Sequence, residues 1–176
     1  GFLALGGPLL ALRPLQVPGS WHLAGATSLP VGLALCSILC AYFAASVVRR
    51  EPVMLRGFAL ELPGPRMTLA QLAISSTDWT FSAAVLWVLL PPAPGLSFAI
   101  FLSAYLLSVV VGLVSHVPGG VGVFETSMVV LLGRFLPGDV VLGAALAYRI
   151  AYYLVPMAFA VLLFGGYELA QRRAAL

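Results

Sequence analysis

Charged and redox-active residues are scarce in this chain. It contains no lysine, only two cysteines and two histidines, and charged residues make up 9% of its 176 positions. Hydrophobic residues reach 61% and the mean hydropathy is +1.06, so too little polar surface exists to cover a water-soluble globule of this size. The sequence therefore predicts an integral membrane protein, with residues 1–176 forming a single membrane domain fragment and no soluble domain.

The same scarcities exclude several kinds of site. The net charge of +3 comes from arginines that stand between apolar runs, so it indicates topology, and we expect no nucleic-acid partner. Cys36 and Cys40 lie one helical turn apart inside an apolar run, where a disulfide is awkward, and both are predicted to be small packing residues. No residues in the sequence have metal-ligand spacing or form a cofactor loop, so we expect neither a metal nor a cofactor.

Proline- and glycine-rich turns divide the chain into apolar segments. A membrane-spanning helix needs about 20 apolar residues. The fold class that we predict is an all-α polytopic helical bundle of about five to six membrane segments, at residues 2–12, 28–48, 67–90, 96–116, 123–136 and 140–167. Segment 123–136 measures roughly 21 Å as a helix, which is short for a bilayer. It is either a tilted crossing or a re-entrant or broken helix.

Arginines set the predicted orientation, because cytoplasmic loops are enriched in basic residues. Two cytoplasmic regions follow, the loop after segment 28–48 and the C-terminal end. Their arginines are Arg49, Arg50, Arg56 and Arg66 in the loop, and Arg172 and Arg173 at the end. A crossing by 123–136 puts both clusters on one side of the membrane, and for that reason we favour a crossing over a re-entrant helix.

A kink between two apolar segments carries the strongest functional signal. Its residues are Pro118, Gly119, Gly120 and Gly122. His116 precedes the kink, and Glu125 follows it in the first turn of the next helix, where the helix dipole favours a negative charge. Ionisable groups at membrane depth are functional candidates, and irregular backbone is tolerated there only beside protein or a wet cavity. The pattern predicts a polar pocket inside the bilayer, with a plain tight turn as the alternative.

Arg149 is the second charge at membrane depth. The residues that share or adjoin its predicted helical face are Tyr148, Tyr152, Tyr153 and Pro156. Arginine suits bidentate binding of a phosphate or a carboxylate, and tyrosines supply amphipathic walls. The alternative is a salt bridge from Arg149 to Glu125 or Asp78 that only holds the bundle together.

Two other segments carry periodic patterns. A polar stripe follows one face of segment 67–90, at Thr68, Gln71, Ser75, Asp78 and Ser82. Hydrogen bonds between helices explain its hydroxyl groups best, whereas Asp78 requires an ion pair, a substrate or a proton. A stripe that predicts close helix packing follows segment 96–116, at Ala104, Ser108, Gly112 and His116.

These motifs resemble the membrane domain of the lysylphosphatidylglycerol synthase/flippase family, also called multiple peptide resistance factor. The likeness rests on residues 115–125, 148–156 and 71–79, together with the pair at 62–63, and covers nearly the whole chain. Carried over by position, Glu125 is the motif glutamate, Arg149 the motif arginine and Asp78 the aspartate before a tryptophan.

The resemblance implies a multi-pass protein of the bacterial cytoplasmic (inner) membrane that moves aminoacylated phosphatidylglycerol to the outer leaflet. That transport lowers the negative surface charge and repels cationic antimicrobial peptides. In bifunctional members a cytosolic C-terminal domain makes the lipid. The implied partners are therefore the phospholipid, the membrane and such an aminoacyltransferase domain, and a homo-oligomer stays open.

Opposite charges would suit a lipid of this kind. We expect Arg149 to meet its phosphate, and Glu125 or Asp78 to meet its ammonium group. The full expected substrate site is Glu125, Arg149, Asp78, Tyr152, Tyr153 and His116. Two other functions stay open: a membrane anchor that delivers substrate to a phosphatidylglycerol lysyltransferase, and a small-solute transporter. No nucleophile with an adjacent base occurs, so we predict no catalytic residue in this chain.

Overall fold

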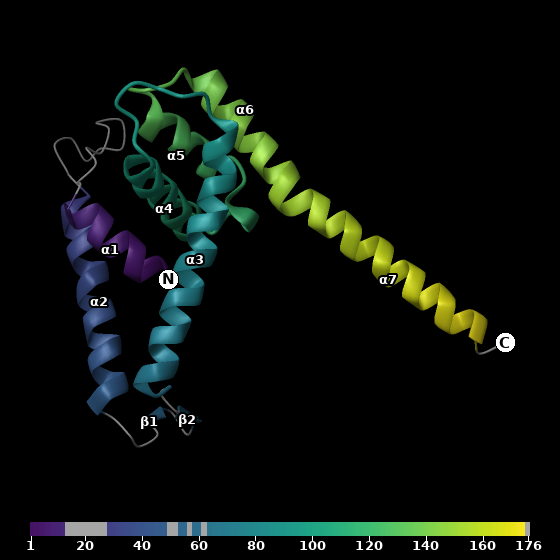
Figure 1. Ribbon diagram of the computed structural model, residues 1–176, viewed down its shortest axis with the longest axis horizontal. Helices are drawn as coiled ribbons and strands as arrows, with labels where there is room; N and C mark the ends of the chain where they lie inside the picture. The colour runs from purple at the N-terminus through teal and green to yellow at the C-terminus, as the bar shows by residue number, and fades with distance from the viewer. Residues whose placement is uncertain (13–27, 49–52, 56–57, 61–62, 175–176) are drawn as a thin grey trace.

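The computed structural model describes residues 1–12, 28–48, 53–55, 58–60 and 63–174. Its helices and strands in chain order are α1 (Phe2–Leu12), α2 (Leu29–Val48), β1 (Val53–Leu55), β2 (Phe58–Leu60), α3 (Pro65–Leu89), α4 (Phe98–Val114), a 3-10 turn (Pro118–Gly120), α5 (Val123–Leu132), α6 (Gly138–Arg149), a π-helical turn (Ile150–Leu154) and α7 (Val155–Ala174). Helices dominate this part of the chain, which confirms the predicted all-α membrane fold (Figure 1).

A short β-hairpin before α3 is an addition that the sequence did not predict. Its strands pair antiparallel with Val53 opposite Leu60, and each has three residues, too few for a periodic pattern to reveal. The arginines at 49, 50 and 56, on which the predicted orientation partly depends, lie outside the described residues. Arg66 stands in the first turn of α3, and positions 172 and 173 fall in the last turns of α7.

Within the described residues, three helical stretches are long and apolar enough to span a membrane, namely α2, α3 and the continuous helix Gly138–Glu168. The apolar helices α1, α4 and α5 have only 11, 17 and 10 residues. At the usual helical rise α5 is about 15 Å long, half the thickness of a bilayer core. The predicted segment 96–116 is shortened to α4 because the backbone of His116 adopts a left-handed conformation, with φ of 55°.

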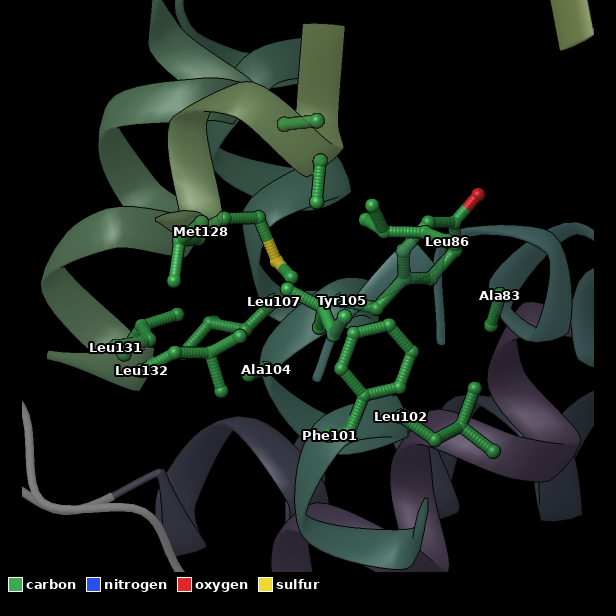
Figure 2. Packing of buried hydrophobic residues seen from close by; sticks show 14 of the residues in the cluster. Ala83, Leu86, Phe101, Leu102, Ala104, Tyr105, Leu107, Met128, Leu131 and Leu132 are labelled. Carbon is green, nitrogen blue, oxygen red and sulfur yellow. The ribbon is translucent and has the colours of Figure 1, made fainter. Parts of the chain in front are cut away.

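α4 is the central helix of the packed core. Every residue from 101 to 108 is buried, because α3, α5 and α1 pack around it. Figure 2 shows Phe101 and Tyr105 of α4 between Leu86 of α3 and Met128 of α5. Because lipid tails are as apolar as these side chains, close packing of the side chains is what holds such helices together in a membrane.

Small and hydroxyl residues join the outer helices to the core. A Cβ on Gly7 of α1 would lie 2.8 Å from the sulfur of Cys36, so this cysteine serves as a packing residue, as predicted. On the predicted polar stripe, Thr68 of α3 bonds Ser46 of α2 at 2.8 Å, and Gln71 accepts a bond from Tyr42 at 3.4 Å. The interpretation of the stripe as a hydrogen-bonded seam is confirmed for these two positions.

The start of α4 and the end of α5 lie at the same end of the bundle. The ring of Trp87, near the end of α3, lies 5.6 Å from that of Phe98, which begins α4. A Cβ on Gly95, in the α3–α4 loop, would lie 3.8 Å from the ring of Phe135 in the α5–α6 loop. α4 therefore leads away from these loops and α5 returns toward them, with the 3-10 turn at the far end of the pair.

α7 departs from the other helices. Figure 1 shows it extending from α6, away from the bundle. Its exposed apolar side chains include Met157, Phe159, Val161, Leu162, Leu163 and Phe164. The predicted last segment, 140–167, lies within one unbroken helix. Part of that helix is a π-helical turn, in which the N–H of Val155 bonds to the carbonyl of Ile150. Such turns within helices frequently mark functional sites.

Candidate functional site

The chain reverses direction between α4 and α5 through a strained, glycine-rich turn. The glycines at 119, 120 and 122 adopt φ values of 66°, 58° and 82°, which residues with a side chain rarely tolerate. A Cβ on Gly120 would also lie only 3.3 Å from the Cα of Gly112. Glycine at this position thus permits both the left-handed backbone and the close approach of the turn to α4.

An ion pair between Glu125 and Arg149 fastens this turn. Glu125 lies in the first turn of α5, where one carboxylate oxygen accepts a bond from the N–H of Gly122 at 2.7 Å. The other oxygen accepts a bond from Nε of Arg149. The guanidinium group also donates to the carbonyls of Gly119 and Gly120, at 3.1 and 3.2 Å. Arg149 thereby joins the end of α6 to the turn and to α5.

The electrostatic setting favours this pair. Glu125 lies in the first turn of α5, where the helix dipole stabilises its negative charge. The side chains of Glu125 and Arg149 are only 5% and 20% exposed, respectively. Removing one partner of a buried pair typically costs about 3–5 kcal/mol, because the other charge is left uncompensated. The salt-bridge alternative for Arg149 is therefore realised with Glu125 and not with Asp78.

An aromatic cluster adjoins the ion pair. The hydroxyl groups of Tyr105 on α4 and Tyr148 on α6 lie 2.9 Å apart, and Tyr148 stacks on Tyr152 with ring centroids 5.3 Å apart. Tyr152 in turn bonds Ser82 of α3 at 2.6 Å. The ring of Phe124 lies 5.9 Å below the guanidinium carbon of Arg149. These contacts connect α3, α4, α5 and α6 around the start of the π-helical turn.

A cavity of about 480 Å³ opens between α4, the turn and the end of α6. Its lining residues are Tyr105, Val109, Gly112, Leu113, His116, Val117, Gly119, Gly120, Phe124, Tyr148, Arg149 and Tyr153. The volume is within the usual range for small-ligand sites, which combine apolar walls with a few placed polar groups. Arg149 is the charged residue of this lining, and aromatic rings form much of its wall.

The structure brings three of the six predicted substrate-site residues to this cavity. Arg149, His116 and Tyr153 line it, together with the glycines at 119 and 120. Glu125 is 4% exposed and lies behind Arg149, outside the lining. Tyr152 also lies outside it and instead bonds Ser82.

Two predicted positions lie away from the cavity. Asp78 is exposed on α3 and has no hydrogen bond or ion pair with any other described residue. Pro156 is exposed on α7, because the π-helical turn shifts it off the face that carries Arg149.

The predicted packing stripe on α4 is confirmed at three of its four positions. Ala104 and Ser108 are fully buried, and Gly112 is buried against the turn, whereas His116 is exposed. The ring nitrogen Nδ1 of His116 lies 2.7 Å from the carbonyl of Val114, so it carries the proton and leaves Nε2 for other partners.

Tyr105 and Phe124 form the part of the wall that sequence reasoning did not assign. Tyr105 precedes Gly112 by seven residues, so the two share a helical face, and this spacing was the available signal. Within the described ranges, no three His, Cys, Asp or Glu residues lie close enough together to hold a metal ion.

Comparison with known proteins bears on what this cavity is for. Residues 1–160 match the model of the family described as the lysylphosphatidylglycerol synthase TM region. The chain is 37% identical over 173 residues to the uncharacterized protein slr0712 of Synechocystis, a match that covers 98% of this chain and 54% of that protein. It is 29% identical over 164 residues to the inner membrane protein YbhN of Escherichia coli, covering 92% and 51%.

A shorter match involves a much larger protein. Over 94 residues the chain is 37% identical to the phosphatidylglycerol lysyltransferase of Staphylococcus haemolyticus, covering 51% of this chain and 11% of that protein. Against slr0712 and YbhN, by contrast, the chain spans about half the length of its relative.

Proposed function

The chain belongs to the lysylphosphatidylglycerol synthase transmembrane family, and we propose that it moves aminoacylated phosphatidylglycerol across the bacterial inner membrane. The observation that carries this proposal is the aromatic cavity beside Arg149, in a chain whose long helices are apolar enough to span a membrane. A phospholipid headgroup needs a charged contact in a place that its apolar chains can also reach. This cavity combines both properties.

Arg149 supplies the contact for the phosphate. A guanidinium group has five N–H donors, and three of them bind Glu125 and the two glycine carbonyls. One N–H on each terminal nitrogen is left, in the fork geometry that suits two phosphate oxygens. Glu125 acts through Arg149, since it holds the guanidinium in place and neutralises its charge when no lipid is bound.

Translocation requires the site to face each leaflet in turn. The parts suited to that movement flank Arg149 on both sides. On one side the turn at 118–122 depends on left-handed glycines, and on the other the π-helical turn at 150–154 separates α6 from α7. A shift in either would change the opening of the cavity without breaking the core around α4. Delivery of the lipid to the outer leaflet would reduce the negative surface charge and so support resistance to cationic antimicrobial peptides.

Transport can be tested directly in liposomes. The complete protein is reconstituted in phosphatidylcholine liposomes that contain lysyl-phosphatidylglycerol, and an impermeant amine reagent labels the outer leaflet. We expect the labelled fraction to rise with time beyond that of protein-free liposomes. The Glu125→Gln/Arg149→Gln double variant, which removes both charges together, is the matched control and should show no such rise. Equal labelling with and without the protein would refute transport.

Delivery of substrate to a lysyltransferase is the second candidate function. It is favoured by the 94-residue match to the Staphylococcus haemolyticus phosphatidylglycerol lysyltransferase. The two functions predict different lipid phenotypes in cells that lack the protein. Loss of delivery lowers the total amount of aminoacylated lipid, whereas loss of transport changes only its distribution between the leaflets. Leaflet-resolved lipid analysis distinguishes them.

A further inference from the structure

We infer that the cavity selects its lipid by the phosphodiester and not by the amino group, so that it also accepts phosphatidylglycerol that carries no amino acid. This inference rests on the proposed function and specifies the ligand class of the same site. It follows from which charges line the cavity, which are buried behind it, and which lie elsewhere.

The cavity lining offers a cation and no carboxylate. Arg149 is its charged residue, and the other polar groups are His116, three tyrosine hydroxyls and backbone groups of the turn. An ammonium group buried in a membrane site needs a carboxylate or several acceptors, because desolvating an unpaired charge is costly. A phosphate oxygen, by contrast, finds the two unused N–H groups of Arg149 there.

Glu125 cannot serve as the missing carboxylate in this arrangement. Each of its oxygens accepts one bond, from Gly122 and from Arg149, and the residue is only 4% exposed and lies outside the cavity lining. An ammonium group could reach it only after displacing Arg149, which would also release the carbonyls of the turn. Glu125 is therefore a positioning residue for Arg149.

Asp78 cannot serve either, because it lies outside the lining on the exposed surface of α3. Aromatic rings are the remaining means of binding a cation, and the lining provides Tyr105, Phe124, Tyr148 and Tyr153. The guanidinium of Arg149 already lies over Phe124, however, and Tyr148 is buried at 2% exposure against Tyr105 and Tyr152. An enclosed aromatic cage for a second cation is thus not formed.

The inference makes a quantitative prediction about binding. The complete protein in micelles of a detergent without phosphate is loaded with a fluorescent phosphatidylglycerol, and short-chain phosphatidylglycerol and lysyl-phosphatidylglycerol are used as competitors. We expect the two competitors to displace the probe at concentrations within about threefold of each other, since the shared phosphodiester supplies the selective contact. Short-chain diacylglycerol, which carries the same chains without a phosphodiester, serves as the reference for unselective partitioning.

Two variants separate the possible sources of selectivity. Glu125→Gln/Arg149→Gln should weaken both competitors equally, by about tenfold or more, while keeping the pair uncharged and the fold intact. Asp78→Asn should leave the ratio of the two affinities unchanged. Asp139→Asn, a change to an exposed acid on the first turn of α6, is the control for loss of one negative charge.

Three results would overturn the inference. The first is a preference of about tenfold or more for lysyl-phosphatidylglycerol. The second is a selective loss of that lipid in Asp78→Asn, and the third is displacement by neither competitor. The liposome assay decides the proposed function separately: transport of the lysylated lipid together with a strong preference for it leaves the function standing and removes only this inference.

Discussion

α4 and α7 are both apolar helices, yet they occupy opposite surroundings. Residues 101–108 of α4 are all buried, whereas the large side chains of α7 from Met157 to Phe164 are exposed. Hydropathy alone does not separate α4 from residues 155–167 of α7, which are also uncharged, since a helix that is apolar all round suits a protein core or a lipid environment equally. The difference lies in the neighbours: α4 is enclosed by other helices, and α7 extends away from them (Figure 1). The cavity stands where the enclosed part ends.

Breaking the ion pair should have the largest effect on stability, because this pair joins α5 of the packed core to the end of α6. Arg149→Gln leaves Glu125 buried without a cation and should lower stability by about 3–5 kcal/mol. Membrane abundance and thermal unfolding in a fixed detergent measure this loss.

The double variant Glu125→Gln/Arg149→Gln tests what the pair does. It should recover most of the abundance lost in Arg149→Gln but not the transport. Recovery of transport as well would mean that the pair is purely structural.

Truncation of equivalent aromatic side chains compares the two helices directly. Phe101→Ala removes a fully buried ring from α4 (Figure 2) and should cost about 3–5 kcal/mol. Phe159→Ala removes a ring of α7 that is 63% exposed and should cost less than about 0.5 kcal/mol. Thermal unfolding of both variants in the same detergent measures the difference. Similar losses would show that α7 packs against protein in the native membrane.

A change in the turn should have a smaller energetic effect but a strong functional one. Gly120→Val places a branched side chain at a φ of 58° and against Gly112, which should cost about 1–3 kcal/mol and abolish transport. The matched control is Gly143→Val, because Gly143 lies on α6 with no other atoms near its Cβ position. Lipid transport per unit of membrane-inserted protein is the measurement. Normal transport by Gly120→Val would reduce the turn to a simple connector.

Cysteine labelling perturbs the protein least and tests how α4 and α5 lie in the membrane. In a background with Cys36→Ala and Cys40→Ala, single cysteines replace Gly64, Pro94 and Arg134, all of which are exposed. We expect Gly64→Cys to react from the cytoplasm, and Pro94→Cys and Arg134→Cys to react from outside, because the loops at 95 and 135 adjoin. Labelling of position 134 only from the cytoplasm would contradict the predicted crossing by segment 123–136, which brings the end of α5 to the outer side.

Hydropathy and turn chemistry predicted the long helices to within a few residues: segments 28–48 and 67–90 correspond to Leu29–Val48 and Pro65–Leu89. They also predicted a kink with charges on both sides of it. Hydropathy and turn chemistry could not predict which acid pairs with Arg149, because Glu125 and Asp78 were both possible partners until the helices were placed. The contact of Tyr105 with Tyr148 depends on two segments 43 positions apart, and no local pattern encodes it.

Segment 96–116 and the π-helical turn show a second limit. Apolar content predicted a full span for 96–116, but the left-handed backbone at His116 ends α4 at Val114. The π-helical turn leaves no mark in hydropathy, because Ile150–Leu154 is as apolar as the helix on either side. Backbone geometry of this kind is set by the tertiary contacts of Arg149 and Tyr152.

The π-helical turn lies directly after Arg149, at the position where a hinge between α6 and α7 would have to be. α7 has 20 residues and is therefore about 30 Å long at the usual helical rise. A change of about 10° in the angle at residues 150–154 displaces the far end of α7 by about 5 Å, as its length dictates. A change in this angle beside the guanidinium group that is too small to alter the packing around α4 would therefore produce a large displacement at the far end of α7.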